Sequence, residues 1–494
     1  MAFDDSTGWG IRQKVGLFLG PALLLLFVVT PAPESLGSAG WLTAGLALLM
    51  ATWWISESVP IPATALLPLA LFPIAGVGTI GEAASPYAEP VIFLFMGGFL
   101  IALAMQRWQL HRRIALRIIA RVGTGPSAIV GGFMIAAAIL SMWVSNTATA
   151  LMMLPVALSV IDLADASADG IVKSNFAIAL VLGIAYGCNI GGMATIVGTP
   201  PNALLVGFIA SEYGHTISFV NWMAVGLPLV VVGLPIAFIV LTRITCPLRI
   251  RTLPGAAETV AGELRGLGPI STEEKRVGAV FVLTALAWIT RPLLLPLIPS
   301  LSDAGIAMIG GLALFVIPSN LRTGTFLMDW RTARRLPWGT LILFGGGLSL
   351  AGAFTRTGLS QWIGESMGGM SGLPVLLVLL VVIAVVVFLT ELTSNTATTA
   401  TFLPVIAAMA LGIGENPLLL AIPAVLGASC AFMLPVATPP NAIVYGSGRV
   451  TVPQMARAGV ILNVLFIGVI TVLAYTLVIW VFGVESGVIP DWVV

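Results

Sequence analysis

The polar triplet Ser-Asn-Thr occurs twice within otherwise apolar stretches, at residues 145–147 and 394–396. Hydroxyl and amide oxygens suit a small hard cation such as Na⁺, and the same groups can hydrogen-bond an anion. A second motif, Thr-Pro-Pro-Asn, begins at Thr199 and again at Thr438. Proline has no N–H to donate, so a proline pair frees main-chain carbonyls of the preceding turn. The four motifs favour a site that binds a cation and an anion together.

The composition places these motifs in a membrane. Of the 494 residues, 58% are hydrophobic and 9% are charged, and the mean hydropathy is +1.06, whereas a soluble domain carries about 25% charge. A bilayer core of about 30 Å needs about 20 apolar residues per helix, and uncharged runs of that length recur. The net charge of +1 indicates no basic face for nucleic acid. We therefore expect an all-α polytopic membrane protein.

Basic residues set the expected topology, because Lys and Arg favour cytoplasmic loops. With the N-terminus in the cytoplasm, all but two of the 22 basic residues (Arg291 and Arg356) fall on the cytoplasmic side. This arrangement gives about 11 transmembrane helices in the plasma (inner) membrane and an extracytoplasmic C-terminus. The expected spans are 15–30, 41–56, 61–77, 91–106, 176–209, 218–242, 277–298, 302–319, 338–355, 417–445 and 458–482.

Two apolar stretches, 126–161 and 372–411, are left over, and each contains one triplet. Their shorter arms of about 12 residues reach roughly 20 Å at 1.5 Å per residue, which is less than a bilayer. We therefore expect two re-entrant hairpins with a triplet at each tip. Ordinary helices joined by polar side chains are the alternative. A full crossing by the first stretch would move the basic loop 243–276 outside.

The two stretches belong to an internal duplication. A shift of 249 residues (394 − 145) superposes the triplets, and a shift of 239 (438 − 199) superposes the proline motifs. One offset that holds over about 60 residues indicates a repeat, and the charge topology inverts the second copy. The aligned segments include Leu94-Phe95 with Leu343-Phe344, Gly97-Gly98 with Gly346-Gly347, and Leu154-Pro155-Val156 with Leu403-Pro404-Val405.

This duplication divides the chain into a first transmembrane helix (1–40), a first repeat (41–242), a cytoplasmic linker (243–276) and a second repeat (277–494). Inverted repeats with broken helices are typical of secondary transporters, whose sites lie near the membrane midplane. A channel would more naturally show pore-lining rings.

An enzyme would need a nucleophile–base pair, paired aspartates or a metal cluster. We interpret only Glu57 and Glu391 as intramembrane acids, and the repeat does not relate them to each other; the histidines, His111 and His215, fall in loops. The three cysteines lie far apart, without metal spacing. We expect no enzymatic activity, and we expect Glu391 either to tune a cation site or to be a hydrogen-bonded structural acid. The arginines between 107 and 121 are interpreted as an amphipathic arm that contacts anionic headgroups.

The motif set resembles the divalent anion/sodium symporter family over nearly the whole chain. The matching segments are the two triplets, GTPPN (198–202), ATPPN (437–441), WWISESVPIPATALLPLALFP (53–73) and FGGGL (344–348). The resemblance implies an elevator-type secondary active transporter that imports divalent anions by sodium symport, as a homodimer in the lipid bilayer. C4-dicarboxylates such as succinate, malate and fumarate fit best. The alternatives are citrate, sulfate, or a sodium-independent dicarboxylate exchanger.

The resemblance also implies roles for individual residues. The substrate would contact Ser145, Asn146, Thr147, Thr199, Ser394, Asn395, Thr396, Thr438 and Pro439. At least two sodium ions would be co-substrates. Their ligands would be Ser141, Ser145, Asn146 and Gly198 for the first ion, and Thr390, Thr393, Asn395 and Ala437 for the second. An exchanger would be expected to place Lys, Arg or His at these positions, and the motifs contain none.

Overall fold

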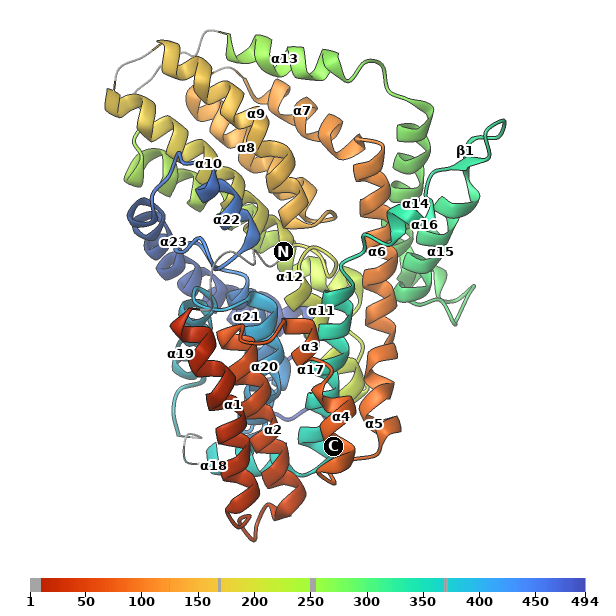
Figure 1. The fold of residues 1–494 in the computed structure, drawn as a ribbon, viewed down its shortest axis with the longest axis vertical. Helices are drawn as coiled ribbons and strands as arrows, with labels where there is room; N and C mark the ends of the chain where they lie inside the picture. The colour runs from red at the N-terminus through yellow and green to blue at the C-terminus, as the bar shows by residue number, and fades with distance from the viewer. Residues whose placement is uncertain are drawn as a thin grey trace.

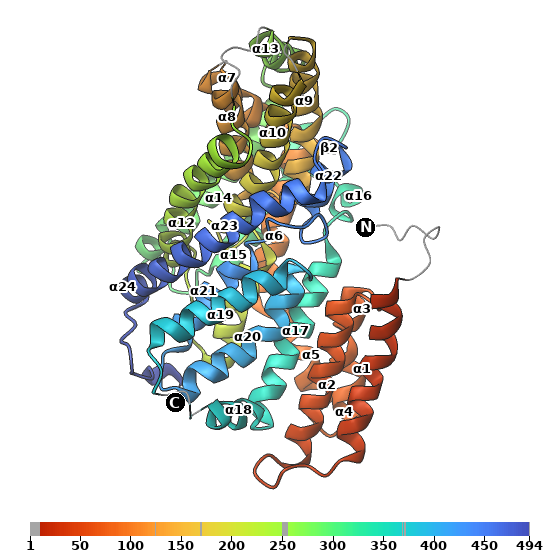
Figure 2. The same ribbon diagram turned by 90° about the vertical axis from the view of Figure 1, so that its left-hand side faces the viewer.

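The structure is a computed structural model that describes residues 10–123, 125–167, 170–248, 255–367, 369 and 372–493. Nearly all of its elements are helices (Figures 1 and 2). The first half contains α1 (Ile11–Val29), α2 (Gly37–Ser56), α3 (Ile61–Thr64), α4 (Leu67–Ile74), α5 (Ile80–Ala84), η1 (Ser85–Ala88), α6 (Pro90–Arg107), α7 (Leu110–Val122), α8 (Pro126–Ser141), α9 (Asn146–Ser167), α10 (Gly170–Gly192), α11 (Pro200–Tyr213), α12 (Phe219–Ile239) and η2 (Val240–Thr245).

The second half begins with a short helix and a long one, followed by a small antiparallel β-hairpin. Its elements are α13 (Ala256–Gly266), α14 (Thr272–Leu294), α15 (Asp303–Val316), β1 (Pro318–Asn320), β2 (Thr325–Phe326), α16 (Trp330–Ala333), α17 (Trp338–Arg356), α18 (Leu359–Met367), α19 (Val375–Thr390), α20 (Asn395–Gly412), α21 (Pro417–Ala428), α22 (Pro439–Gly446), α23 (Val452–Leu473), η4 (Ala474–Val478), α24 (Ile479–Phe482) and η5 (Asp491–Val493).

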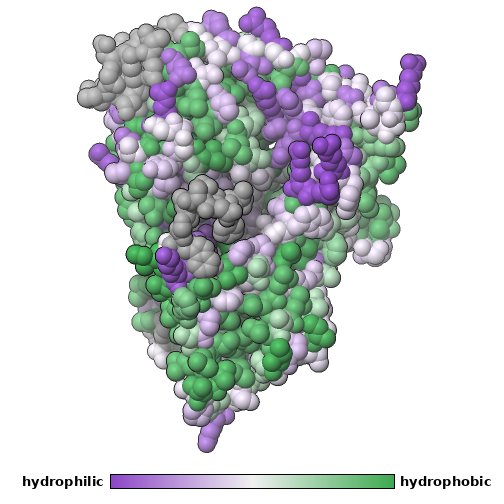
Figure 3. All heavy atoms as spheres, in the orientation of Figure 1, coloured by the Kyte–Doolittle hydropathy of each residue, from purple (hydrophilic) through white to green (hydrophobic). Residues whose placement is uncertain are grey.

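The helices have the length and composition of membrane spans. Ten helical stretches in the described part of the chain are long and apolar enough to cross a bilayer, and a helix satisfies its own backbone groups in lipid. In Figure 3 hydrophobic residues cover most of the lower part of the molecule. Hydrophilic residues gather at the upper end, over α13, and around β1 and α16 (Figures 1 and 3). The predicted all-α polytopic fold class is confirmed.

The two expected crossings that contain the proline pairs are interrupted. Within 176–209, α10 ends at Gly192 and α11 begins at Pro200; within 417–445, α21 ends at Ala428 and α22 begins at Pro439. The second helix of each pair starts at the proline pair, because a proline at the first helical position loses no hydrogen bond. The breaks thus fall at the proline pairs, where the sequence predicted freed main-chain carbonyls.

Each triplet lies at the start of a helix. α8 ends at Ser141 and α9 begins at Asn146, while α19 ends at Thr390 and α20 begins at Asn395. α8 and α19 have 16 residues each, or about 24 Å, but α9 has 22 residues, or about 33 Å. The length of α9 therefore gives no argument against a crossing, and re-entry by both hairpins stays a prediction.

Close packing at small residues brings each triplet beside one of the interruptions. α8 contacts α10, and a Cβ added at Gly191 would lie 2.3 Å from the carbonyl oxygen of Ala138, so only glycine fits there. α19 contacts α21, where Gly427 faces Val387 and Ile383. Figure 1 shows α8, α9 and α10 side by side, and Figure 2 shows the same for α19, α20 and α21.

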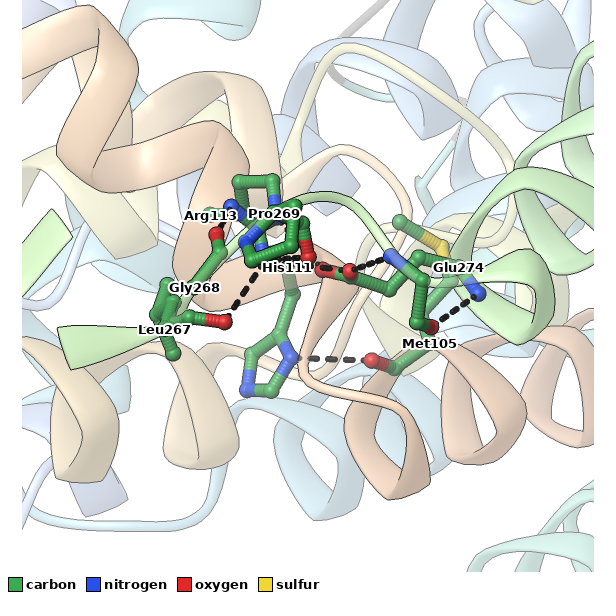
Figure 4. Close-up of polar contacts among 8 residues, drawn as sticks. Met105, His111, Arg113, Leu267, Gly268, Pro269 and Glu274 are labelled. Carbon is green, nitrogen blue, oxygen red and sulfur yellow. Dashed lines mark hydrogen bonds and ion pairs between the residues drawn. The ribbon is translucent and has the colours of Figure 1, made fainter. Parts of the chain in front are cut away.

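The helix α7, which leads into α8, is fixed by a buried ion pair (Figure 4). Arg113 Nε lies 2.6 Å from Glu274 Oε1, and its Nη2 lies 3.1 Å from Oε2. The same guanidinium donates to the carbonyls of Leu267, Gly268 and Pro269. The Arg113 side chain is only 5% exposed, so the predicted headgroup contact is wrong for this residue. Two neighbouring arginines also pair with carboxylates, Arg112 with Glu263 and Arg107 with Asp329.

Candidate functional site

The first triplet lies at the gap between α10 and α11. The hydroxyl of Thr195, within that gap, donates to the main-chain oxygen of Met142 at 2.5 Å. Ser145 caps the returning helix α9, because its Oγ accepts a hydrogen bond from the N–H of Ala148 at 3.2 Å. The tip that carries the triplet and the interrupted helix pair are therefore hydrogen-bonded to each other.

Buried oxygens without hydrogen-bond partners occur at this junction. Within the described chain, Ser141 Oγ and Asn146 Oδ1 are inaccessible and unpaired. A Cβ added at Gly192 would lie 3.1 Å from the amide oxygen of Asn146 and 3.2 Å from the carbonyl oxygen of Gly198, so these two oxygens face a common space. An unpaired buried oxygen is unfavourable, and a bound cation would satisfy it. These residues fit a sodium ion.

The second triplet has the same placement, but its oxygens are hydrogen-bonded. Thr390 Oγ1 lies 2.7 Å from Asn395 Oδ1 and 2.8 Å from the carbonyl oxygen of Ala428. The hydroxyls of Thr393 and Thr398 also share a hydrogen bond. A threonine hydroxyl has one hydrogen, so Thr390 donates to one of its two acceptors at a time. A cation here would replace an existing hydrogen bond, whereas at the first triplet it would meet free oxygens.

The predicted site residues lie at two depths. Ser141 and Thr390 are fully buried. The motif threonines Thr199 and Thr438 are at most 6% exposed. The six triplet residues are half-buried and Pro439 is exposed. The candidate cation ligands that end α8 and α19 thus lie deeper than the triplet residues and Pro439, which are predicted to contact substrate.

The helices that begin at the four motifs contact one another crosswise. α9, which starts at the first triplet, contacts α22, which starts at the second proline pair; α20 and α11 make the reciprocal contact. Gly347 of the FGGGL segment lies between Ala400 of α20 and Leu204 of α11. In Figure 1, α22 lies beside α10. Each triplet helix is thus packed against the proline-motif helix of the other half, and the N-termini of such helices favour anions.

Glu391 is a hydrogen-bonded acid at the tip of the second hairpin. Its Oε1 accepts from the main-chain N–H groups of Phe432 at 2.7 Å and Met433 at 2.9 Å, and from Asn463 Nδ2 at 2.7 Å. Its Oε2 accepts from the N–H of Leu434 at 3.1 Å. Of the two interpretations of Glu391, the structural one therefore has direct geometric support: the carboxylate holds the gap between α21 and α22.

Several residues at the site were missed by the sequence argument. Trp143 stacks on Trp288 of α14 at a centroid distance of 6.4 Å and packs against Phe219; its place two residues before the triplet was the available signal. Arg12 donates to the carbonyl oxygen of Leu392 at 2.9 Å, across a separation that no local pattern indicates. No role was predicted for the asparagines of the two proline motifs, although their presence in both halves was a signal for one.

A cavity of about 450 Å³ lies elsewhere along α9. Its walls come from the α6–α7 junction, from Glu263, and from the Leu151–Ser159 part of α9, and they include none of the predicted site residues. His111 in this wall places Nδ1 3.0 Å from the carbonyl oxygen of Met105 (Figure 4). Burial lowers the pKa of His111, so this imidazole is neutral at pH 7 and provides no fixed charge for an anion.

In each half of this helical membrane protein, a hydroxyl–amide triplet lies beside a broken helix. This construction is typical of a secondary transporter. The family profile described as the sodium:sulfate symporter transmembrane region matches residues 12–484. The chain therefore belongs to this family, the divalent anion/sodium symporters, as its motifs predicted.

Curated relatives and solved structures agree with this assignment. The sodium-dependent dicarboxylate transporter SdcS of Staphylococcus saprophyticus is 43% identical over 489 residues, which cover 97% of this chain and 94% of the relative. SdcS of Staphylococcus aureus is 42% identical over 488 residues, with 97% and 93% coverage.

The fold is also similar to two solved transporters. The YdaH transporter of Alcanivorax borkumensis has a TM-score of 0.57 at 14% identity, with 96% of this chain and 99% of the other covered. MtrF of Neisseria gonorrhoeae has a TM-score of 0.58 at 12% identity, with 97% and 96% covered. At these identities the likeness concerns the fold alone.

Proposed function

We propose that this protein imports C4-dicarboxylates such as succinate, malate and fumarate by sodium symport. One observation carries the proposal: the buried, unpaired oxygens of Ser141 and Asn146 adjoin a half-buried hydroxyl–amide triplet. Such oxygens favour a cation, and the triplet supplies hydrogen bonds for an anion. The names of the two staphylococcal relatives, sodium-dependent dicarboxylate transporters, support the same pairing.

Charge compensation supports sodium as the co-substrate. The motifs contain no Lys, Arg or His, and burying an unpaired dianion is very unfavourable. Two sodium ions would neutralise a dicarboxylate, and the N-termini of α9, α20, α11 and α22 would add favourable dipoles. We assign substrate contacts to Ser145, Asn146, Thr147, Thr199, Ser394, Asn395, Thr396, Thr438 and Pro439. We assign sodium contacts to Ser141, Ser145, Asn146, Gly198, Thr390, Thr393, Asn395 and Ala437.

Uptake into proteoliposomes tests this function. Purified protein should accumulate labelled succinate with an inward sodium gradient, and choline or potassium in place of sodium should reduce uptake to that of protein-free vesicles. Unlabelled citrate and sulfate, as competitors, should inhibit less than malate or fumarate. Equal uptake in all three salts would reject symport and favour a sodium-independent exchanger, and stronger inhibition by citrate or sulfate would reassign the substrate.

We also propose that transport proceeds by an elevator movement of the two hairpins within a homodimer. The stacking of Trp143 on Trp288 joins the first tip to α14 and would have to break during that movement. A crosslink between cysteines at these two positions should therefore abolish uptake while sodium-dependent succinate binding persists. Uptake that continues with the crosslink formed would contradict a sliding motion.

The proposed orientation places the N-terminus and the linker 243–276 in the cytoplasm and the C-terminus outside. Thr323, in the β1–β2 turn, and Ser366, in α18, are both exposed and would lie on opposite sides of the membrane. With the three buried native cysteines replaced, Ser366→Cys should react with an impermeant thiol reagent in intact cells. Thr323→Cys should react only after the cytoplasmic face is opened, and the reverse pattern would invert the topology.

A further inference from the structure

The asparagines of the two proline motifs make the same pair of hydrogen bonds in each half. Asn202 Nδ2 donates to the carbonyl oxygens of Gly192 at 3.1 Å and Thr195 at 2.8 Å. Asn441 Nδ2 donates to those of Ala431 at 3.1 Å and Leu434 at 3.0 Å. In both halves the acceptors precede the asparagine by ten and seven residues (202 − 192 and 202 − 195; 441 − 431 and 441 − 434). Both side chains are completely buried.

These bonds fix the main chain between the two helices of each interrupted pair. The last carbonyls of α10 and α21 have no intrahelical partner, and the proline pairs that follow supply no N–H. Asn202 binds the carbonyl of Gly192, the last residue of α10, and that of Thr195 within the gap. Asn441 binds the carbonyls of Ala431 and Leu434, both within the gap that follows α21. The loop that it closes contains Gly198 in the first half and Ala437 in the second, the residues whose main-chain oxygens are assigned to sodium.

The amide also sets the position of the triplet's partner. Asn202 binds Gly192, and a Cβ at Gly192 would lie 3.1 Å from the Asn146 amide. The Gly192 main chain thus lies between the asparagine of the proline motif and the asparagine of the triplet. A shift of this backbone would change the distance between Asn146 Oδ1 and the Gly198 carbonyl, which together face the candidate cation position.

The second half has an additional connection to the first. Asn189 of α10 places Nδ2 3.0 Å from the carbonyl oxygen of Ala431, 3.2 Å from Thr438 Oγ1 and 3.3 Å from Asn441 Oδ1. One turn earlier, Tyr186 donates to the carbonyl oxygen of Phe432 at 2.8 Å. α10 therefore ends in the first gap and also contacts the second. A movement of its last turns would shift the main chain in both gaps.

We propose that Asn202 and Asn441 are positioning residues for the first and second sodium sites, and that Asn189 couples the two sites. The proposal rests on the proposed function, because it takes sodium as the cation. In this role the asparagines act through the main chain, by way of their amide nitrogens. They hold the carbonyls of Gly198 and Ala437 in the geometry that lets a small cation bind.

Sodium titration of the purified protein, followed by thermal unfolding without substrate, tests the proposal, because a ligand that binds only the folded state raises the unfolding temperature. Asn202→Ala and Asn441→Ala should each raise the sodium concentration for half-maximal stabilisation by about tenfold or more. Asn202→Ser and Asn441→Ser, which keep one donor, should show smaller shifts and provide folded protein if the alanine variants fail. Asn189→Ala should make the titration less steep.

Asn416→Ala is the matched control. Asn416 is a buried asparagine that caps α21 at the end away from the gap, by accepting from the N–H of Leu418 at 2.9 Å. This variant should lose stability without a shift of the sodium titration. If the Asn202 and Asn441 variants behave like Asn416→Ala while the wild type responds to sodium, the positioning role is overturned. A wild type without any sodium response would instead overturn the proposed function and the inference that rests on it.

Discussion

Succinate uptake at a subsaturating sodium concentration is expected to fall on the order of a hundredfold or more when Asn146 is replaced by alanine. Asn146 Oδ1 is buried and unpaired, and we assign the amide to both sodium and substrate. Loss of one such interaction costs about 1–3 kcal/mol, and every 1.4 kcal/mol is a factor of about ten. Asn395→Ala should have a comparable effect in the second half.

Ser141→Ala and Thr390→Ala separate the two ligands. They should raise the sodium needed for half-maximal uptake by roughly tenfold to a hundredfold, with the succinate KM at saturating sodium unchanged. Ser159→Ala, an exposed position on α9 whose hydroxyl bonds only the Pro155 carbonyl, should resemble the wild type. An Asn146→Ala protein with wild-type sodium dependence and KM would remove this residue from the site.

The second large effect concerns stability. Glu274→Gln should lower the free energy of unfolding by about 3–5 kcal/mol, because it leaves the Arg113 guanidinium charged, buried and without its carboxylate. Both side chains of this pair are at most 5% exposed. Arg112→Met, on the same helix, breaks the Arg112–Glu263 pair, whose side chains are both 34% exposed, and should cost about 0–1 kcal/mol.

Detergent-induced or thermal unfolding of the wild type, Glu274→Gln and Arg112→Met, each with and without sodium, measures the difference in stability. The double variant Arg113→Met/Glu274→Leu should recover part of the loss, since no unpaired charge is left in the interior. Equal stabilities for Glu274→Gln and Arg112→Met would show that the buried pair does not fix α7 to the first turn of α14.

The features that were predictable from sequence are those that local sequence patterns determine. Apolar length predicts helices, and two offsets, 249 and 239, pair the triplets and the proline motifs before any coordinates are known. The starts of α9, α20, α11 and α22 follow, because prolines and N-capping residues determine where helices begin. Ser141 and Ser145 are likewise close to Asn146 in the chain.

The parts that could not be predicted depend on contacts between distant segments. Asn189 reaches Ala431 over 242 residues, and Arg12 reaches Leu392 over 380. Arg113 appears as one basic residue of an amphipathic helix until Glu274, 161 residues later, is seen beside it. Glu391 had two equal interpretations because no sequence pattern reveals that three consecutive N–H groups, at 432–434, face its carboxylate.

Coupling between sodium and dicarboxylate is tested most directly by reversing the driving force. Proteoliposomes would hold equal sodium inside and outside, with the membrane potential held at zero, and receive succinate and labelled sodium outside only. Symport predicts that the inward succinate gradient drives labelled sodium above its equilibrium distribution, and that omission of succinate or the Asn146→Ala change abolishes this accumulation. Succinate entry with no sodium movement beyond that in protein-free vesicles would contradict the proposed mechanism.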